Sequence, residues 1–93
     1  MAVTVELPRA LQPYARGQTV VVLDRPVATV EDALGALEDH WPGVVDRVLT
    51  EQRVVRQHVN LFVDEENIRH LEGLQTRLPS RCTITILAAV SGG

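Results

Sequence analysis

The sequence contains no lysine, because all nine of its basic residues are arginine. The chain therefore offers no side-chain ammonium group to accept an activated acyl group. Its single cysteine, Cys82, excludes an internal disulfide, a four-cysteine zinc site and a four-thiolate iron–sulfur cluster. None of the three histidines has the His-x-x-x-His or Glu-x-x-His spacing of a metal site: His40, His58 and His70. We expect no bound metal and no bound cofactor.

Long apolar runs are also missing. No stretch approaches the ~18 apolar residues that a membrane span requires, and residues 1–8 lack the basic flank and apolar stretch of a secretory signal. The basic residues are scattered and the formal net charge is −3, which argues against a nucleic-acid partner. Repeats, linkers and low-complexity segments are absent. We therefore expect one cytoplasmic domain over residues 1–93, with no membrane among its partners.

The chain begins with two strand patterns. Val3, Val5 and Leu7 alternate with polar residues, which is typical of a half-buried strand. After an intervening loop, residues 19–23 are dense in β-branched side chains, which predicts a second strand. The two strands are close enough in sequence to pair as a hairpin.

A helical stripe follows. Apolar residues recur at i, i+3, i+4, i+7 and i+11, which are Val30, Ala33, Leu34, Leu37 and Trp41. Thr29 can cap the first turn, and Pro42 disfavours helical geometry at the residue before it, so the helix should end at Trp41. We expect Trp41 to complete the core face of this helix. Residues 43–50 predict a short second helix.

The second half of the chain predicts three more strands. A strand over 59–63 places Phe62 on the face opposite its other apolar residues. The consecutive carboxylates of 64–66 would splay apart at a solvated turn, so we expect no catalytic pair there. A short return strand is predicted at 68–69, before a connector. In the last strand Cys82 alternates with other core residues, where a free cysteine behaves as a small hydrophobe.

Two apolar side chains fall on the polar side of this pattern. Phe62 and Leu87 lie opposite the core residues of their strands, so they can form an exposed patch that docks a partner. The alternative is that a loop buries Phe62.

The order of elements predicts an α+β fold. Two strands, one long helix, and then a strand, a short strand and a strand describe the β-grasp, or ubiquitin-like, arrangement. In it one long helix packs on one face of a mixed sheet. The first and last strands would lie parallel at the sheet centre, because the intervening helix supplies the crossover.

The chain ends on Gly92 and Gly93 directly after the last strand pattern. Glycine has no Cβ, so a glycine backbone can pass through a slot that is too narrow for any side chain. This ending suits entry into the active site of another protein, with the terminal carboxylate as the working group. The alternative is a frayed end or a cloning remnant.

The chain resembles the MoaD/ThiS sulfur carriers, and most closely their longer branch of cysteine-biosynthesis carriers. The resemblance covers essentially the whole domain and is densest in residues 59–69 and 83–93. Two departures stand near the tail: the turn Leu78–Arg81 is not rich in Asp and Gly, and Ala88 stands where the family often has proline. They leave open which activating enzyme and which acceptor are the cognate ones.

The resemblance implies that the chain is a sulfur carrier on which partner enzymes act, and that it has no catalytic residues of its own. An E1-like adenylating enzyme of the MoeB, ThiF or MoeZ type would use ATP and Mg to adenylate the carboxylate of Gly93. Sulfur would then replace AMP, and the thiocarboxylate would serve a sulfur-accepting enzyme such as a cysteine synthase. The flexible tail 88–93 would thread into the partner through Ala89, Val90, Ser91 and Gly92.

Two other classes remain open. A ubiquitin-like modifier conjugated through its terminal glycine needs the same tail and the same activation. A non-catalytic β-grasp interaction module would tolerate deletion of the tail. The sequence does not distinguish sulfur transfer to cysteine, thiamine, molybdopterin or a secondary metabolite.

Overall fold

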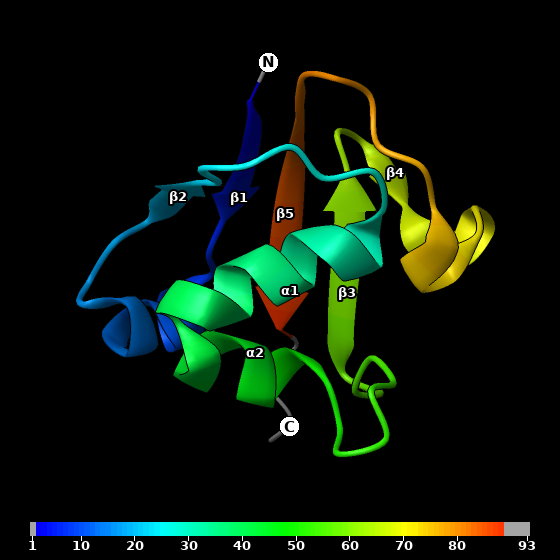
Figure 1. Cartoon of the computed structure of the whole chain (residues 1–93). Coiled ribbons are helices and arrows are strands. Elements are labelled where there is room, and N and C mark those ends of the chain that lie inside the picture. The colour runs from blue at the N-terminus through cyan, green and yellow to red at the C-terminus, as the bar shows by residue number, and fades with distance from the viewer. Residues whose placement is uncertain (1, 89–93) are drawn as a thin grey trace.

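The computed structural model describes residues 2–88. Five strands form one mixed sheet, and two α-helices lie on one side of it (Figure 1). The strands and α-helices are, in chain order, β1 (Val3–Glu6), β2 (Val20–Val22), α1 (Val30–His40), α2 (Pro42–Val48), β3 (Val59–Val63), β4 (Glu66–Asn67) and β5 (Cys82–Ala88). The predicted α+β class is confirmed, and the strands and helices lie close to the ranges that the sequence patterns indicated.

The last strand lies at the centre of the sheet. The strand order is β2-β1-β5-β3-β4, so β5 is paired on both sides. It runs parallel to β1, with Ile84 opposite Val5, and antiparallel to β3, with Ile86 opposite Leu61. The parallel pair requires a crossover, and α1 lies in that connection across one face of the sheet (Figure 1). The predicted central parallel pair is therefore confirmed.

The core lies between the sheet and α1. The inward side chains of the strands are buried, namely Val3, Val5, Val21, Val59, Leu61, Val63, Cys82, Ile84 and Ile86. They meet a helix stripe that is buried from Val30 to Leu37. Trp41 packs against this core but is only half-buried. The prediction that it completes the core face of the helix is therefore confirmed only in part. Its backbone leaves helical geometry, with φ −134° and ψ 64°, so α1 ends before it.

The start of α1 is fixed by a cap and by neighbouring chain. The hydroxyl of Thr29 accepts a hydrogen bond from the Asp32 N–H at 3.1 Å, as predicted. The Val30 N–H donates to the carbonyl of Thr76 at 3.1 Å, and the Leu78 N–H donates to the carbonyl of Ala28 at 2.9 Å. These bonds hold the helix N-terminus against the segment that leads into β5.

Two segments differ from the sequence-based expectation. The return strand β4 is Glu66–Asn67 and not 68–69, because Asp64 adopts a left-handed φ of 55° and lets Val63 pair with Glu66 across a two-residue turn. Ile68 instead begins a 3-10 helix and is buried. The connection between β1 and β2, expected as a loop, contains a 3-10 helix over Arg9–Ala15.

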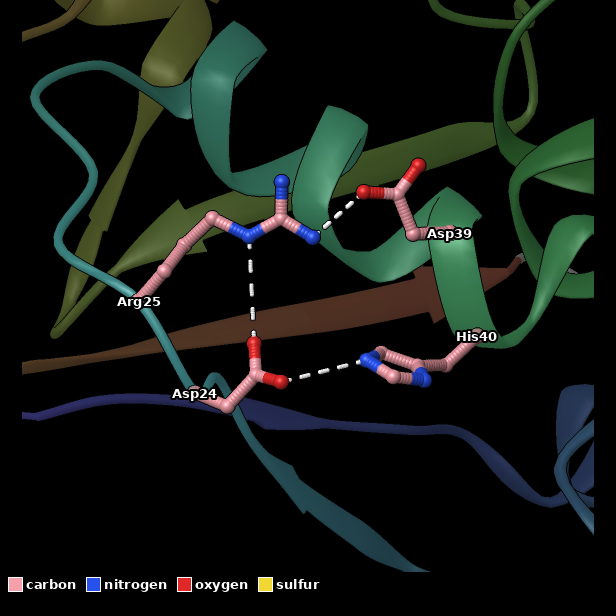
Figure 2. Close-up of polar contacts among 4 residues, drawn as sticks. All are labelled: Asp24, Arg25, Asp39 and His40. Carbon is pink, nitrogen blue, oxygen red and sulfur yellow. Dashed lines mark hydrogen bonds and ion pairs between the residues drawn. The ribbon is translucent and has the colours of Figure 1, made fainter.

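An exposed ionic cluster ties the loop after β2 to the end of α1 (Figure 2). Arg25 pairs with Asp39, and its Nε lies 3.8 Å from Asp24 Oδ1. His40 Nε2 lies 3.3 Å from Asp24 Oδ2, and this hydrogen bond holds the pKa of the Asp24 carboxyl below its usual value. The hydrogen bond to Asp39 raises the pKa of Arg25. All four side chains are exposed, so the cluster orients this corner more than it stabilises the fold.

Candidate functional site

The end of β5 is the base from which the predicted tail departs. β5 stays paired up to its last residue, because Ala88 lies opposite Val59 of β3. Ala88, expected as the first tail residue, is therefore part of the sheet. Residues 89–93, which include the predicted working group at Gly93 and the predicted threading residues, lie outside the described part of the chain. Their roles stay predictions.

Side-chain hydrogen bonds to main-chain carbonyls hold the start of β3 next to this point. Arg69 Nη2 donates to the carbonyls of Gln57 at 3.1 Å and Val59 at 3.2 Å. Arg56 donates from Nε and Nη2 to the carbonyl of Asp46 at 3.1 and 2.9 Å, which fixes the strand entry against the end of α2. The strand that flanks the end of β5 is thus anchored at its first residues.

Phe62 and Leu87 lie on the same sheet face, the one away from α1. Phe62 is opposite Thr85 and Leu87 is opposite Asn60, so the two apolar side chains are diagonal neighbours. Leu87 is 48% exposed, while Phe62 is half-buried. We call this side of the sheet the outer face. The structure brings the two predicted docking residues together there, and their docking role stays a prediction.

Two valines extend the apolar character of the outer face, and the sequence analysis missed them. Val20 and Val22 of β2 are 42% and 60% exposed, and they point away from the core on either side of buried Val21. Residues 20–23 are all apolar, so their sequence does not show which of them point away from the core. The pairing register with β1 shows it, because Val20 lies opposite Glu6, which is polar and exposed.

Polar groups separate the apolar side chains of the outer face. Thr85 lies between Phe62 and Glu6 in the ladder, and its hydroxyl donates to Glu6 Oε1 at 3.3 Å. Asn67 Nδ2 donates to Asn60 Oδ1 at 3.2 Å. A partner that covers this face would meet hydrogen-bonding groups as well as apolar surface.

Cys82 lies in the core, and the carboxylates of residues 64–66 lie at the surface. Cys82 is buried in the core as predicted, and burial raises the pKa of its thiol, with a smaller contribution from Asp64. All three carboxylates are exposed: Asp64 and Glu65 form the turn, and Glu66 is the first residue of β4. Asp64 bonds back to β5, where its Oδ1 accepts from the Thr83 N–H at 3.0 Å. Between residues 2 and 88, no group of three or more His, Cys, Asp or Glu side chains is placed to hold a metal ion. No helix in that range is long and apolar enough to span a membrane.

Comparisons with known proteins place this geometry in one family. The model of the ThiS family matches residues 5–93. The sulfur carrier protein CysO of Mycobacterium tuberculosis is 34% identical, with 100% of each chain covered. The small archaeal modifier protein 3 of Haloferax volcanii is 33% identical over 66 residues, which is 71% of each chain.

A solved structure shows the same fold. The crystal structure of the BexX/CysO complex of Amycolatopsis orientalis contains a chain that matches with a TM-score of 0.87 at 32% identity, covering 99% of this chain and 100% of that one.

Proposed function

This chain belongs to the ThiS family and is a sulfur carrier protein, and we propose that its working group is the terminal carboxylate of Gly93. The observation that carries the proposal is the family match, which runs through the final Gly92–Gly93. The central position of β5 supports it. β5 is paired with β1 up to Thr85 and with β3 up to Ala88, so it presents the following residues from a fixed base.

The proposed chemistry begins with activation, because a carboxylate has no leaving group that sulfur can displace at neutral pH. A carboxylate oxygen of Gly93 attacks the α-phosphorus of ATP, and the bond to pyrophosphate breaks. ATP and Mg²⁺ are bound by the activating partner, where the ion polarises phosphoryl oxygens. The product is an acyl-adenylate on Gly93.

Sulfur then replaces the nucleotide. A sulfide ion or a partner persulfide attacks the carbonyl carbon of Gly93, and the carbon–oxygen bond to AMP breaks. With a persulfide, a second partner thiol then breaks the sulfur–sulfur bond of the persulfide and forms a disulfide with the first partner thiol, which releases the thiocarboxylate. Gly93 is left as a thiocarboxylate, which is the nucleophile that the acceptor enzyme uses.

The chain contributes shape and recognition to these steps. We assign Gly92 the role of lying in the narrow part of the partner's channel, because it has no side chain. Ala89, Val90 and Ser91 set the approach from the end of β5. The outer face, with Phe62 and Leu87, is the proposed docking surface for the activating enzyme. Leu87 lies next to Ala88 in β5, so a partner docked there is adjacent to the tail.

We propose two kinds of partner. The first is an E1-like adenylating enzyme of the MoeB, ThiF or MoeZ type, and the second is a sulfur-accepting biosynthetic enzyme such as a cysteine synthase. The solved complex of a CysO relative with BexX supports the expectation that this domain binds other proteins. The pathway that receives the sulfur is not specified by any contact within residues 2–88.

Intact-mass spectrometry tests the proposal. The full chain is incubated with an activating enzyme, ATP, Mg²⁺ and sulfide, and we expect the mass gain of one oxygen-to-sulfur exchange. A chain without Gly93 is the control and should gain nothing. If the full chain shows no such gain while the same enzyme activates its own carrier, the proposed chemistry is wrong for this chain.

A second candidate function is protein modification. Small archaeal modifier proteins are among the sequence and structural relatives, which supports a terminal glycine joined to amines of other proteins. This chain has no lysine, so copies of it cannot be joined into a polymer through lysine side chains. The two functions can be separated by the sizes of the species that contain this chain in a cell extract. A modifier appears as a ladder of larger species that survives thiol treatment, and a sulfur carrier stays at its own mass.

A further inference from the structure

A groove on the helix side of β3 is an apolar feature that the tail chemistry does not use. Its apolar lining consists of Val54, Val55, Val59, Leu61, Ile68 and Leu74. Arg53 and Arg69 also line it and are the charged residues that the described part of the chain contributes to it. We call it the β3-edge groove. Val59, on its floor, is paired with Ala88, so the groove lies one strand away from the end of β5.

One wall of the groove is a turn that is held in place on both sides. The Thr50 N–H donates to the carbonyl of Val54 at 2.8 Å, and the Arg53 N–H donates to the carbonyl of Thr50 at 2.9 Å. Arg53 has a left-handed φ of 64°, and its guanidinium makes two hydrogen bonds to Glu38 of α1, at 3.1 and 3.2 Å. This anchored turn presents Val54, which is 57% exposed, at the mouth of the groove. Val54 is continuous with the apolar lining of the groove, and a contiguous apolar patch of this kind marks a contact surface.

Arg69 determines what kind of segment fits. β4 covers only the end of β3 at Phe62 and Val63, so no strand within residues 2–88 pairs with this edge near Val59. Arg69 Nη2 occupies the carbonyls of Gln57 and Val59 there, which blocks addition of a strand by hydrogen bonding. A ligand must therefore enter by its side chains and not by its backbone.

The charge of the groove determines which polar group a ligand should carry. Arg53 is neutralised by Glu38, whereas Arg69 forms no ion pair with a carboxylate among residues 2–88. Its Nε and Nη1 donors make no hydrogen bond to the described residues. Guanidinium groups prefer carboxylate partners, so the complement of this groove is an aliphatic side chain with a carboxylate beside it.

We propose that the β3-edge groove is a second docking surface, which binds a helical segment of a partner protein carrying an aliphatic side chain and a neighbouring carboxylate. The aliphatic side chain contacts Val54, Val55 and Leu74, and the carboxylate pairs with Arg69. The groove and the outer face lie on opposite sides of the sheet, so a partner can hold the domain here while the outer face stays free. The proposal does not depend on the chemistry of Gly93.

An NMR titration of the full, methyl-labelled chain tests this docking surface. The probe is a lactam-stapled helical peptide, acetylated and amidated, with one leucine and a glutamate one turn away. We expect saturable shifts of the methyl groups of Val54, Val55 and Leu74. A matched peptide with lysine in place of glutamate should bind about tenfold more weakly, which corresponds to the loss of one good ion pair.

Two variants of the chain assign the contacts. Arg69→Gln keeps a donor for the carbonyls of β3 but removes the charge, so the preference for the glutamate peptide should disappear. Val54→Glu should weaken the glutamate peptide by about tenfold or more. Val22→Glu changes an equally exposed valine on the outer face and should leave the titration unchanged. Thermal melts check that each variant is folded.

Three results would overturn the proposal. The first is equal binding of the two peptides to the wild-type chain, and the second is the absence of saturable shifts at the groove methyl groups. The third is a concentration-dependent shift of these groups without peptide, which would assign the groove to a second copy of the chain. Thiocarboxylate formation by Val54→Glu separates the two proposals, because it should proceed even if the groove binds nothing.

Discussion

Val59 lies directly opposite Ala88 in the ladder between β3 and β5. This pairing is the last contact of the central strand and sets the point from which the residues after 88 must reach a partner. Side-chain hydrogen bonds from Arg69 and Arg56 hold the neighbouring backbone. The reach of the terminal carboxylate is therefore measured from a fixed position.

Deletion of Gly93 should abolish activation. It moves the terminal carboxylate back by one residue, up to about 3.6 Å in an extended chain. Acyl transfer requires reacting atoms within about 3–3.5 Å, so the shortened chain should not reach the α-phosphate. The measurement is ATP–pyrophosphate exchange by the activating enzyme, with a thermal melt to show that the domain is unchanged. Exchange at the wild-type rate would mean that this carboxylate is not the activated group.

Gly92→Val should also abolish exchange, for a different reason. The chain keeps its length, but a branched side chain is added where we expect the partner's channel to admit none. Gly92→Ala is the matched control and should retain more activity than the valine variant, because its side chain is smaller. Equal activity of the glycine, alanine and valine forms would show that the channel is wide at this position.

Leu37→Ala should destabilise the domain by about 2–5 kcal/mol, because it deletes a fully buried side chain and leaves a cavity. Leu87→Ala removes the same atoms from a side chain that is 48% exposed and should cost much less. Urea denaturation of the two variants and the wild type measures the difference. Overlapping curves for Leu37→Ala and wild type would contradict the assignment of α1 to the core.

Phe62→Asp should weaken binding to the activating enzyme, since a charge replaces apolar surface on the outer face. Phe62 is half-buried, so its variant should also melt somewhat earlier. Leu87→Asp separates the two effects, because Leu87 is exposed and should lose binding with little loss of stability. The measurement is the dissociation constant of each variant, for example by calorimetry. Unchanged binding of both would remove the outer face from the docking surface.

Acid should reveal the contact between Asp24 and His40. The hydrogen bond to His40 lowers the pKa of Asp24 below 3.8 in the folded chain, so the contact stabilises the fold above that pH. The contribution is lost as the pH falls below 3.8 and the carboxylate is protonated. His40→Ala should thus lower the urea midpoint near about pH 5, and the difference from wild type should shrink toward about pH 2. His58→Ala, at another exposed histidine, is the control and should show no such trend. A constant difference across this range would exclude the ionic contact.

The strands and the main helix were predictable because their signals are local. The alternation of Val3 and Val5, and of Cys82 and Ile84, reflects the two-residue period of a strand with one buried face. The stripe from Val30 to Leu37 reflects the helical period. The family resemblance also rests on local blocks of residues, and the comparisons confirm it. Each of these features can be detected without knowing which segments meet in space.

Sequence by itself therefore determined which stretches bury a face, and hence the α+β class and the family. The tertiary structure decided what depends on meetings between distant segments. It placed Val20 and Val22 on the outer face through their register with β1, and it brought Arg53 to Glu38 and Arg69 to Val59. These contacts carry no periodic signal, because an exposed arginine or a uniformly apolar run is compatible with many partners. Only the packing of the folded chain selects one of them, which is why Val20, Val22 and the β3-edge groove became visible only in the structure, whereas strand alternation already indicated Phe62 and Leu87.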